Sequence, residues 1–566
     1  MASQQTSTPS SEAPAVVRGL SLAAEAISAP FLLGLAGAVF AWGYDGLAYG
    51  LGLGAGILLL QLLIAPLMPQ MGVRSIPELF ALRFGGTAPR AAAAAAVIVA
   101  MATLLVAQLM VGGLVTARLF GLDAGAAIAV AGAALLAVHV LGGRFARTWI
   151  RALVFLLMLL ALLAPAVQLS ADWYGLPVPQ VAYANALAQI QGLEETLLEQ
   201  DLADPAVMKP MLTPFVSLDP LNFFGLVLGL ALGLACLPNV LARHVMGTSV
   251  HAARWSAVWA LLFATLLLTL APALAAYAKL AVLKLVAGSA ELAQLPGWVF
   301  TYGRLGLVDI CGVPAIDAAT IAKACAALPD ASTALRLQDL ALSPDMVALA
   351  APEITGLGPA MFGLIAAAAL AAFLLTADAA LAAIVGALGY EVRSRLAPCA
   401  VVVVALAVAG SIALTHPASI LDVATWALTI AAAALFPPLV IGLWWRRASA
   451  PAATVAVIAG LAVALHYLLA TRYLAPGFFE TWPTLSSAGP TAREIFGELK
   501  NAWVAAAPGP ARDAAWAALD AHAQGIANWW GIERSAAILL ALPVGTAAMV
   551  LVSLALPHRR APETAS

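Results

Sequence analysis

About twelve apolar segments, each roughly as long as a membrane-spanning helix, recur along the 566-residue chain. A helix of roughly 20 apolar residues crosses the hydrocarbon core of a bilayer, which is about 30 Å thick. The segments lack the two-residue alternation of a membrane β-barrel, so they are predicted to be helices. Their approximate limits are 28–47, 48–68, 89–112, 124–142, 149–170, 221–242, 255–285, 358–389, 398–415, 420–445, 451–470 and 536–556. The chain is therefore predicted to be an all-α integral membrane protein, with the lipid bilayer as its surroundings.

Composition excludes several classes of function. Charged residues make up only 10% of the chain, whereas a soluble domain carries about 25%. The 27 basic and 29 acidic residues nearly balance, so no nucleic-acid partner is expected. The sequence contains no GxxxxGK(S/T) loop for ATP, no HExxH, CxxC or GxSxG motif, and no histidines at metal-ligand spacing. We therefore expect neither an enzyme nor an ATP-driven pump, and no cofactor or metal other than a coupling ion, sodium or a proton.

Arginines fall in alternate predicted loops, and this pattern sets the expected orientation. These residues are Arg74, Arg83, Arg90, Arg144, Arg147, Arg151, Arg243, Arg254, Arg393, Arg395, Arg446, Arg447, Arg559 and Arg560. Because basic loops stay in the cytoplasm, both termini are predicted to be cytoplasmic in a bacterial-type inner membrane. The long segments 171–220, 286–357 and 471–535 are then external. Within them, 186–203 and 511–530 have the periodicity of surface helices.

Two apolar segments contain residues that interrupt helices. Segment 28–47 includes Gly34 and Gly37, and segment 221–242 includes Gly233 followed by Pro238. Main-chain groups freed by such interruptions are tolerated in lipid only where they line a cavity. Each segment opens a run of five spans, and such a matched pair indicates a transporter with its site at the midplane of an inverted repeat. The alternative is that the glycines only permit close packing of helices.

Several tracts also carry a family resemblance. They include ISAPFLLGLAGAVFAWGYDGLAYGLG, VRSIPELFALRFG, LGLACLPNVLARH and MFGLIAAAALAAFLLTADAALAAIVGAL, within a match from about residue 20 to about residue 470. With these tracts the chain resembles the sodium:solute symporter family, and most closely its acetate-permease-like branch of monocarboxylate transporters. The resemblance implies a leucine-transporter-like bundle of two inverted five-helix repeats, followed by two extra C-terminal helices.

The resemblance and the spans together predict the organisation of the chain. The predicted parts are a polar cytoplasmic tail at 1–20, a first repeat at 21–170, an external loop with a surface helix at 171–220, a second repeat at 221–445 with an external loop at 286–357, and two extra spans at 446–566 with an external loop at 471–535. Family members usually have one further helix before the first repeat. Its lack here agrees with a cytoplasmic N-terminus and leaves room for a small membrane subunit as a partner.

The resemblance also implies a cation site, the family's second sodium site. Residue by residue, it corresponds to Ala29, Leu32, Ala372, Leu375 and Thr376. Sodium requires oxygen ligands, as other hard cations do. Thr376 retains a hydroxyl, but Leu375 stands where the family has serine. The alternative for Thr376 is a bond from its hydroxyl back to a helix carbonyl.

Asp378 lies three residues beyond Leu375, on roughly the same helix face. A carboxylate inside a membrane span is a functional candidate by default, and we expect Asp378 either to supplement the cation site or to carry a proton. The alternative is an ion pair with an arginine such as Arg151. Glu25, which precedes the first span where the family has an acidic residue, is either a functional residue or a group that stabilises the helix N-terminus.

For an anionic substrate, we expect binding by main-chain amides near Gly34, Gly37 and Gly233, because positive half-helix ends stabilise a carboxylate. Gln108 and Asn239 are candidates to orient the solute, or are polar contacts between helices. The family's GTAGLPH pattern reads GLACLPN here, so the polar character of the second interruption is reduced.

The predicted function is secondary active transport, in which a cation drives symport of a small organic anion, a monocarboxylate such as acetate. The alternatives are a sensor or subunit that retains the symporter fold, and a proton-coupled or passive transporter. Cys311 and Cys325 fall in one predicted external loop, where a disulfide is expected. Cys236 and Cys399 are expected to be free thiols.

Overall fold

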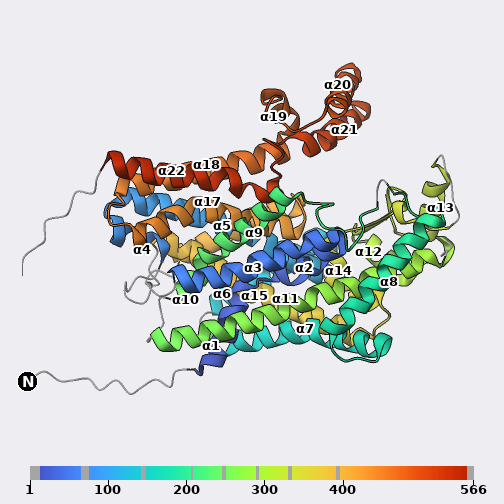
Figure 1. Ribbon diagram of the computed structural model, residues 1–566, viewed down its shortest axis with the longest axis horizontal. Coiled ribbons are helices and arrows are strands. Elements are labelled where there is room, and N and C mark those ends of the chain that lie inside the picture. Colours follow the sequence, from blue (N-terminus) through green and yellow to red (C-terminus); the bar gives the residue numbers. More distant parts are fainter. Residues whose placement is uncertain are drawn as a thin grey trace, which may run out of the picture.

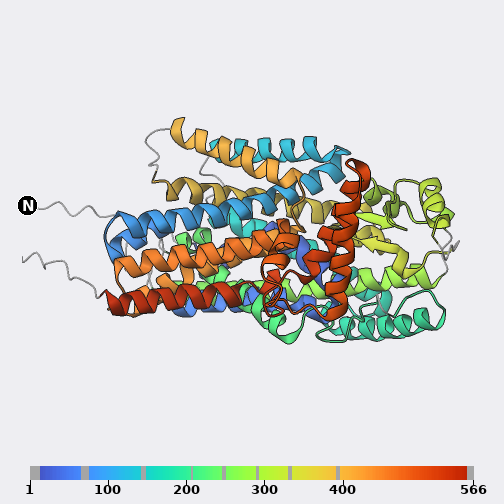
Figure 2. The same ribbon diagram turned by 90° about the horizontal axis from the view of Figure 1, so that it is seen from above.

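The computed structural model describes residues 13–64, 75–141, 148–205, 208–244, 250–288, 292–328, 334–389 and 396–556, most of them helical (Figure 1). Within these ranges, nine helical stretches are long and apolar enough to cross a membrane. They lie alongside one another in a single bundle (Figures 1 and 2). The chain is therefore a multi-pass helical membrane protein, as predicted. Of the arginines that set the orientation, Arg74, Arg144, Arg147, Arg393, Arg395, Arg559 and Arg560 lie outside the described residues.

Six helices form the spans of the first repeat: α1 (Ala15–Ala26), α2 (Ala29–Trp42), α3 (Leu47–Leu59), α5 (Thr87–Phe120), α6 (Ala124–Leu141) and α7 (Thr148–Tyr174). The short helix α4 (Ile76–Phe84) precedes α5. Because α1 begins at Ala15, inside the predicted tail, the first span runs over α1 and α2 rather than over 28–47. The chain doubles back after α2: a Cβ on Gly46 would lie 2.5 Å from the main chain of Ala38, whereas eight residues of continuous helix extend about 12 Å.

The second repeat contains α9 (Pro220–Ala235), α10 (Pro238–His244), α11 (Val250–Ala287), α15 (Pro359–Ala387), α16 (Leu396–Leu414) and α17 (Ile420–Trp444). The extra C-terminal spans are α18 (Ala450–Tyr473) and α22 (Ile538–Ala555). When α2 and α3 are counted separately, and the α9–α10 pair and the shorter α16 are added, the described helices agree with the prediction of about twelve passes. Helix α17 lies deepest in the bundle and packs against α5, α9 and α18.

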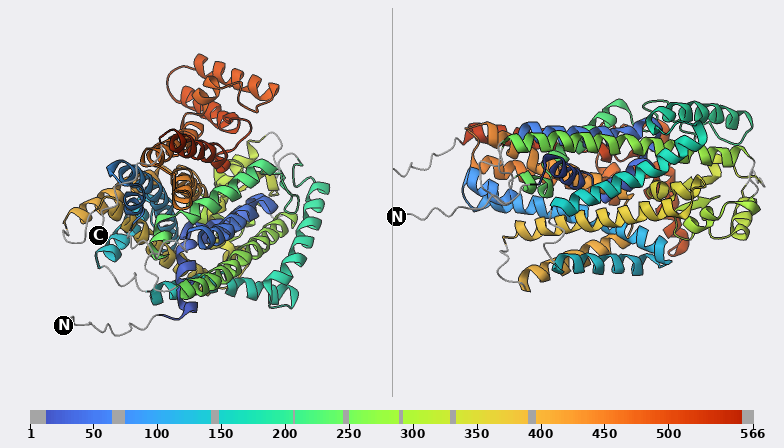
Figure 3. Two further views of the ribbon diagram at one scale, coloured as in Figure 1. Left: turned by 60° about the vertical axis from the view of Figure 1, so that its left-hand side comes forward. Right: turned by 90° about the horizontal axis from the view of Figure 1, so that it is seen from below.

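The two ends of the bundle differ. One end, which we call the terminal face, carries the start of α1 and the end of α22 (Figures 1 and 2). The opposite end, the loop face, carries most of the helices that do not span: α8 (Pro179–Glu199), α12 (Gly297–Gly303), α13 (Ala318–Ala326), α14 (Val347–Ile354), α19 (Ala475–Thr481), α20 (Pro490–Ala505) and α21 (Pro510–Ile526). Helices α20 and α21 project beyond the other helices (Figure 3). Helices α8 and α21 confirm the two predicted surface helices, with shifted limits.

A small antiparallel sheet also lies at the loop face, in the order β2–β1–β3. Its strands are β1 (Val308–Ile310), β2 (Val313–Pro314) and β3 (Leu340–Leu342). Ile310 pairs with both Val313 and Leu340. The sheet and the helices around it form a compact layer over the spans.

Asp45 ties the two repeats together at the loop face. Its carboxylate is fully buried in the turn after α2 and accepts hydrogen bonds from the N–H groups of Phe215 (2.7 Å), Ser217 (2.7 Å) and Leu218 (3.0 Å). A carboxylate that accepts several main-chain bonds is strongly stabilised in its charged form. The segment that leads into α9 is therefore fixed against the end of α2.

Cys311 and Cys325 form a disulfide between the β1–β2 turn and α13, with their Cα atoms 5.2 Å apart. This separation lies in the range that a disulfide needs. Cys236 is a buried free thiol and Cys399 an exposed one, so the structure agrees with the predicted pairing.

We predict that replacing both bridged cysteines by serine lowers the stability of the loop-face layer by about 3 kcal/mol, because the closed loop is then free in the unfolded segment. The expected result in hydrogen–deuterium exchange is faster exchange over residues 308–342, with the spans unchanged. Cys399→Ser is the matched control. Recovery of alkylated Cys311 from unreduced wild-type protein would contradict the bridge.

Candidate functional site

The first span of each repeat is broken into two helices. Helices α1 and α2 are separated at Ile27–Ser28, and α9 and α10 at Cys236–Leu237. The second break follows Gly233 closely, as predicted. The first lies earlier than predicted, because Gly34 and Gly37 are inside α2.

Gly34 and Gly37 serve close packing instead. A Cβ on Gly34 would lie 2.9 Å from the Leu421 side chain, and a Cβ on Gly37 would lie 2.0 Å from the carbonyl oxygen of Pro344. Their amides therefore belong to a regular, closely covered helix rather than to an opened main chain. The prediction that the first helix opens near these glycines is wrong.

Ser28 lies at the first break and is a candidate site residue that the sequence interpretation missed, because it relied on the glycines. It precedes α2, and proline occupies the first turn of that helix, a combination that marks a helix start. Its side chain is 5% exposed, and its hydroxyl has no hydrogen-bond partner among the described residues. Buried polar groups without partners are rare and require an explanation such as a ligand.

Gln108 on α5 has the same property. It is fully buried, and neither atom of its amide has a hydrogen-bond partner within the described ranges. One turn along α5, a Cβ on Gly112 would lie 2.9 Å from the ring of Phe373 on α15. Since residues four apart share a helix face, Gln108 faces α15 as well. The alternative prediction, a hydrogen bond that joins helices, is not what the structure has.

The predicted sodium-site residues lie on two helices that pack against each other, α2 and α15. Ala29 and Leu32 occupy the first turn of α2, directly after the break. Ala372, Leu375 and Thr376 lie on α15, and all five are buried. The Thr376 hydroxyl donates to the carbonyl oxygen of Ala372 at 2.7 Å. That oxygen retains lone pairs with which it can accept or ligate.

Asp378 pairs with a histidine and not with an arginine. Its carboxylate lies 2.7 Å from Nδ1 of His139 on α6, and both side chains are about one-fifth exposed. Arg151 is instead bound to Glu25, so the predicted alternative named the wrong partner. Asp378 therefore links α15 to α6, and Nδ1 of His139 donates to its carboxylate in the tautomer that carries the hydrogen on this nitrogen.

Glu25, Arg151 and Asn239 form a buried polar cluster on the terminal side of the breaks. The carboxylate of Glu25 on α1 forms an ion pair with Arg151 on α7 and accepts a 3.4 Å hydrogen bond from the Asn239 amide on α10. All three residues are at least 95% buried. The cluster joins the terminal-side halves of both broken spans to α7. Moving α1 away from α7 separates buried charges, and moving α10 away from α1 breaks a buried hydrogen bond.

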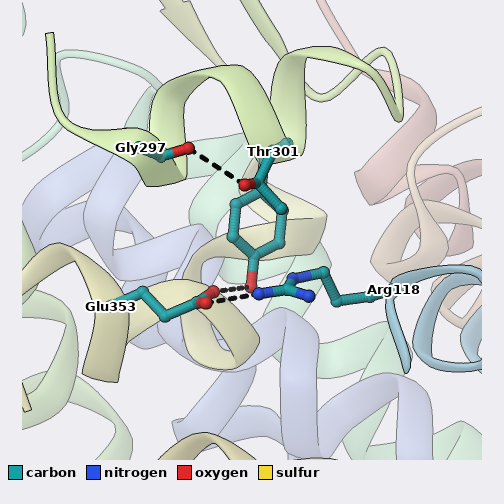
Figure 4. Close-up of polar contacts among 5 residues, drawn as sticks. Arg118, Gly297, Thr301 and Glu353 are labelled. Atoms are coloured by element: carbon teal, nitrogen blue, oxygen red, sulfur yellow. Dashed lines mark hydrogen bonds and ion pairs between the residues drawn. The ribbon is translucent and has the colours of Figure 1, made fainter. Parts of the chain in front are cut away.

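A second set of contacts covers the loop side of the breaks. The 3-10 turn Pro344–Met346 lies on Gly37 of α2, and the carboxylate of Asp345 accepts the N–H of Ile420, the first residue of α17, at 3.0 Å. Helix α14, which follows this turn, is fixed to α5: Arg118 is paired with Glu353, which also accepts a 2.7 Å bond from the Tyr302 hydroxyl (Figure 4). We call Pro344–Ile354 the loop-side cover.

Burial raises the pKa of Asp345 to about 7, and repulsion from Asp422 adds to this effect, whereas the Ile420 bond opposes it. Asp345 also lines a cavity of about 270 Å³ with Arg304 and His416. A carboxyl whose pKa is raised when covered binds its proton more tightly in the closed state. The closed position of the cover is therefore most stable at low pH, where Asp345 is protonated.

The geometry describes a helical membrane transporter with two interrupted spans and a set of contacts on each side of the breaks. The sodium:solute symporter family matches residues 10–294, half of the chain. The protein belongs to this family of cation-coupled symporters.

The chain is also similar to individual relatives. It is 28% identical over 81% of its length to an uncharacterized symporter of Cupriavidus necator, 80% of which is covered. It is 27% identical over 43% of its length to an uncharacterized symporter of Bacillus subtilis, with 44% covered. Among solved structures, a Na⁺-coupled sialic acid symporter is 14% identical, with a TM-score of 0.48, over 82% of this chain and 84% of that one.

We predict that Glu25→Gln or Arg151→Met opens the terminal side, because removing one partner leaves the other charge buried and destabilises the closed form by about 3 kcal/mol. Cys236, which lies at the second break, reports this opening. In a Cys399→Ser background it is the single free thiol, and its maleimide labelling is expected to accelerate at least tenfold in either variant.

Lys500→Gln is the matched control for this prediction, since it removes an exposed ion pair with Glu480 at the loop face. Labelling of Cys236 at the wild-type rate in both Glu25→Gln and Arg151→Met would contradict the role of the cluster.

We predict that the loop-side cover opens more readily as the pH rises from about 4 to about 7 and then changes little. Asp345→Asn should remove this dependence. The measurement is hydrogen–deuterium exchange of peptides over 344–354, corrected for the intrinsic effect of pH. Asp317→Asn, at an exposed helix start in the same layer, is the control. A pH dependence that persists in Asp345→Asn would contradict the assignment.

Proposed function

We propose that the protein takes up a small monocarboxylate such as acetate, together with a coupling cation, by alternating access. The observation that supports this proposal is the pair of broken spans, with one set of buried contacts on the terminal side of the breaks and another on the loop side. If the Glu25 cluster opens while the loop-side cover stays closed, the breaks face one side of the membrane, and the reverse change exposes them to the other. The terminal face is assigned to the cytoplasm of a bacterial inner membrane, with both chain termini there, because the arginine pattern favours it.

The first break suits a carboxylate. Helix α2 begins there, and the positive end of a helix attracts an anion. Its first turn contains Pro30, which has no N–H to donate to an anion. The hydroxyl of Ser28, the residue directly before the helix, is a polar group at this helix start. Gln108 offers two amide hydrogens and one acceptor from α5. A small anion bound between these groups would supply the hydrogen bonds that their side chains lack.

The second break contributes less polarity. The Cys236 thiol donates to the carbonyl oxygens of Leu232 (3.0 Å) and Ala431 (3.3 Å), so it is engaged inside the protein. Asn239 is directed to Glu25. The proposed substrate site is therefore asymmetric, with its polar groups at the first break, which favours a solute with one charged end.

The coupling cation is placed between α2 and α15. Main-chain carbonyls of Ala29, Leu32 and Ala372, with the Thr376 hydroxyl, form the proposed sodium ligands. Leu375 contributes no oxygen ligand. The site therefore offsets less of the free energy that sodium loses with its hydration shell than a site with serine at this position would. The Asp378–His139 pair is the proposed second contributor to coupling, through proton transfer or through an electrostatic effect on the cation. A possible small membrane subunit, expected from the family, has no role in this scheme.

A second candidate function is a sensor or subunit that retains the symporter fold without tight coupling. The presence of Leu375 where the family has serine, and of Cys236 where it has glycine, is the observation that favours it. A transporter accumulates solute against its gradient, a channel equilibrates it, and a sensor moves none. Uptake of labelled acetate into proteoliposomes, with and without a sodium gradient, distinguishes the three.

We predict that Leu375→Ser lowers the sodium concentration for half-maximal uptake by about tenfold, the effect of roughly 1.4 kcal/mol from one added oxygen ligand. Asp378→Asn should abolish gradient-driven uptake. The control for the ligand is Leu374→Ser, one position away on the half-buried face of α15.

The control for Asp378 is His139→Asn, which breaks the same pair but keeps the carboxylate. If the pair is only structural, both variants will transport alike. Normal driven uptake in Asp378→Asn would refute a coupling role and leave its carboxylate as a contact between α15 and α6.

A further inference from the structure

A cavity of about 490 Å³ opens at the loop face, apart from the two breaks. Its inner wall is formed by Trp42 at the end of α2 and Trp426 on α17. Its outer wall comes from the C-terminal part of the chain, with Arg472 at the end of α18 and Arg534 before α22. The cavity is therefore built jointly by the repeats and by the extra helices.

Arg472 and Arg534 are held in place by neutral acceptors. Nε of Arg472 donates to the Pro417 carbonyl at 2.7 Å, and its Nη1 donates to the side-chain oxygen of Gln524 at 2.5 Å. Arg534 donates to the carbonyl of Thr471 at 3.0 Å, which places it beside Arg472. The two guanidinium groups are close enough to repel each other. In the described part of the chain, neither forms an ion pair within 4.0 Å.

Two carboxylates complete the electrostatics of the cavity. Asp422 and Glu533 also line it and attract Arg534 from beyond ion-pair distance. They balance the two positive charges without occupying the hydrogen-bonding edges of the guanidinium groups. An anion that enters gains charge-assisted hydrogen bonds but is also repelled by the two acids, so weak and reversible binding is expected.

We propose that this cavity is an external binding site for a small organic carboxylate, held between the guanidinium groups of Arg472 and Arg534. Guanidinium groups match the planar geometry of a carboxylate, and the indole rings of Trp42 and Trp426 form an apolar wall for its carbon chain. The cavity would collect the solute before the loop-side cover opens. The nature of the solute rests on the proposed function, whereas the presence of an anion site does not.

The test is protection of arginines from phenylglyoxal in the purified full-length protein, followed by peptide mass spectrometry. Sodium acetate and sodium pyruvate are the probes, and sodium chloride at equal concentration is the control. We expect either carboxylate to slow modification of Arg472 and Arg534 at least threefold. Arg512 on α21, whose guanidinium lies over the Trp503 ring, should be modified at an unchanged rate. Equal protection by chloride, or none by the carboxylates, would overturn the proposal.

Variants then relate the cavity to transport. Arg472→Gln is expected to remove the protection of Arg534 and to raise the KM for acetate uptake about tenfold with little change in the maximal rate. The matched control is Arg512→Gln, which should alter neither. A wild-type protein that protects both arginines but accumulates no monocarboxylate would disprove the proposed function and leave the anion site standing. Unchanged protection of Arg534 in Arg472→Gln would overturn the site itself.

Discussion

The main-chain groups of a membrane protein must be bonded inside the protein, and the rest of this structure depends on that constraint. Hydrocarbon offers no partner for a free N–H or carbonyl group, so a helix can stop within the membrane only where other helices surround it. Here α1–α2 and α9–α10 stop at Ile27–Ser28 and Cys236–Leu237, against α5, α15 and α17. The interruptions therefore place helix ends and the unbonded Ser28 hydroxyl inside the protein, and the unbonded amide of Gln108 is buried on the neighbouring helix α5.

Each side of the breaks is closed by a different kind of interaction. On the terminal side, Glu25, Arg151 and Asn239 form a buried cluster whose separation exposes unpaired charge to a medium of low dielectric. On the loop side, the turn at Pro344 packs on Gly37, and Asp345 bonds to the start of α17. Alternating access requires that one set opens while the other holds. The loop side is predicted to respond to pH through Asp345, whereas the terminal side is held by the ion pair of Glu25 with Arg151.

The helices beyond the two repeats add a further property. Through Arg472 and Arg534 they form the outer wall of a charged cavity against α2 and α17. The guanidinium groups are oriented by main-chain and amide oxygens rather than by carboxylates, and they therefore remain available to an anion. The extra spans thus contribute to recognition as well as to the packing of α18 against α17 and α22.

The sequence by itself determined the membrane class, the number of passes, the surface helices and the pairing of Cys311 with Cys325, because these follow from apolar length, periodicity and loop position. It did not locate the first break, because a glycine that weakens a helix and a glycine that allows a neighbouring segment to pack closely look the same in a sequence. Gly34 and Gly37 allow close packing. Nor did it assign the partners of Arg151 and Asp378. Those pairs, Glu25 and His139, lie more than 100 residues away in the chain. Only the packing of α1 on α7 and of α6 on α15 decided them, because ion pairing in a membrane depends on which helices meet and at what depth.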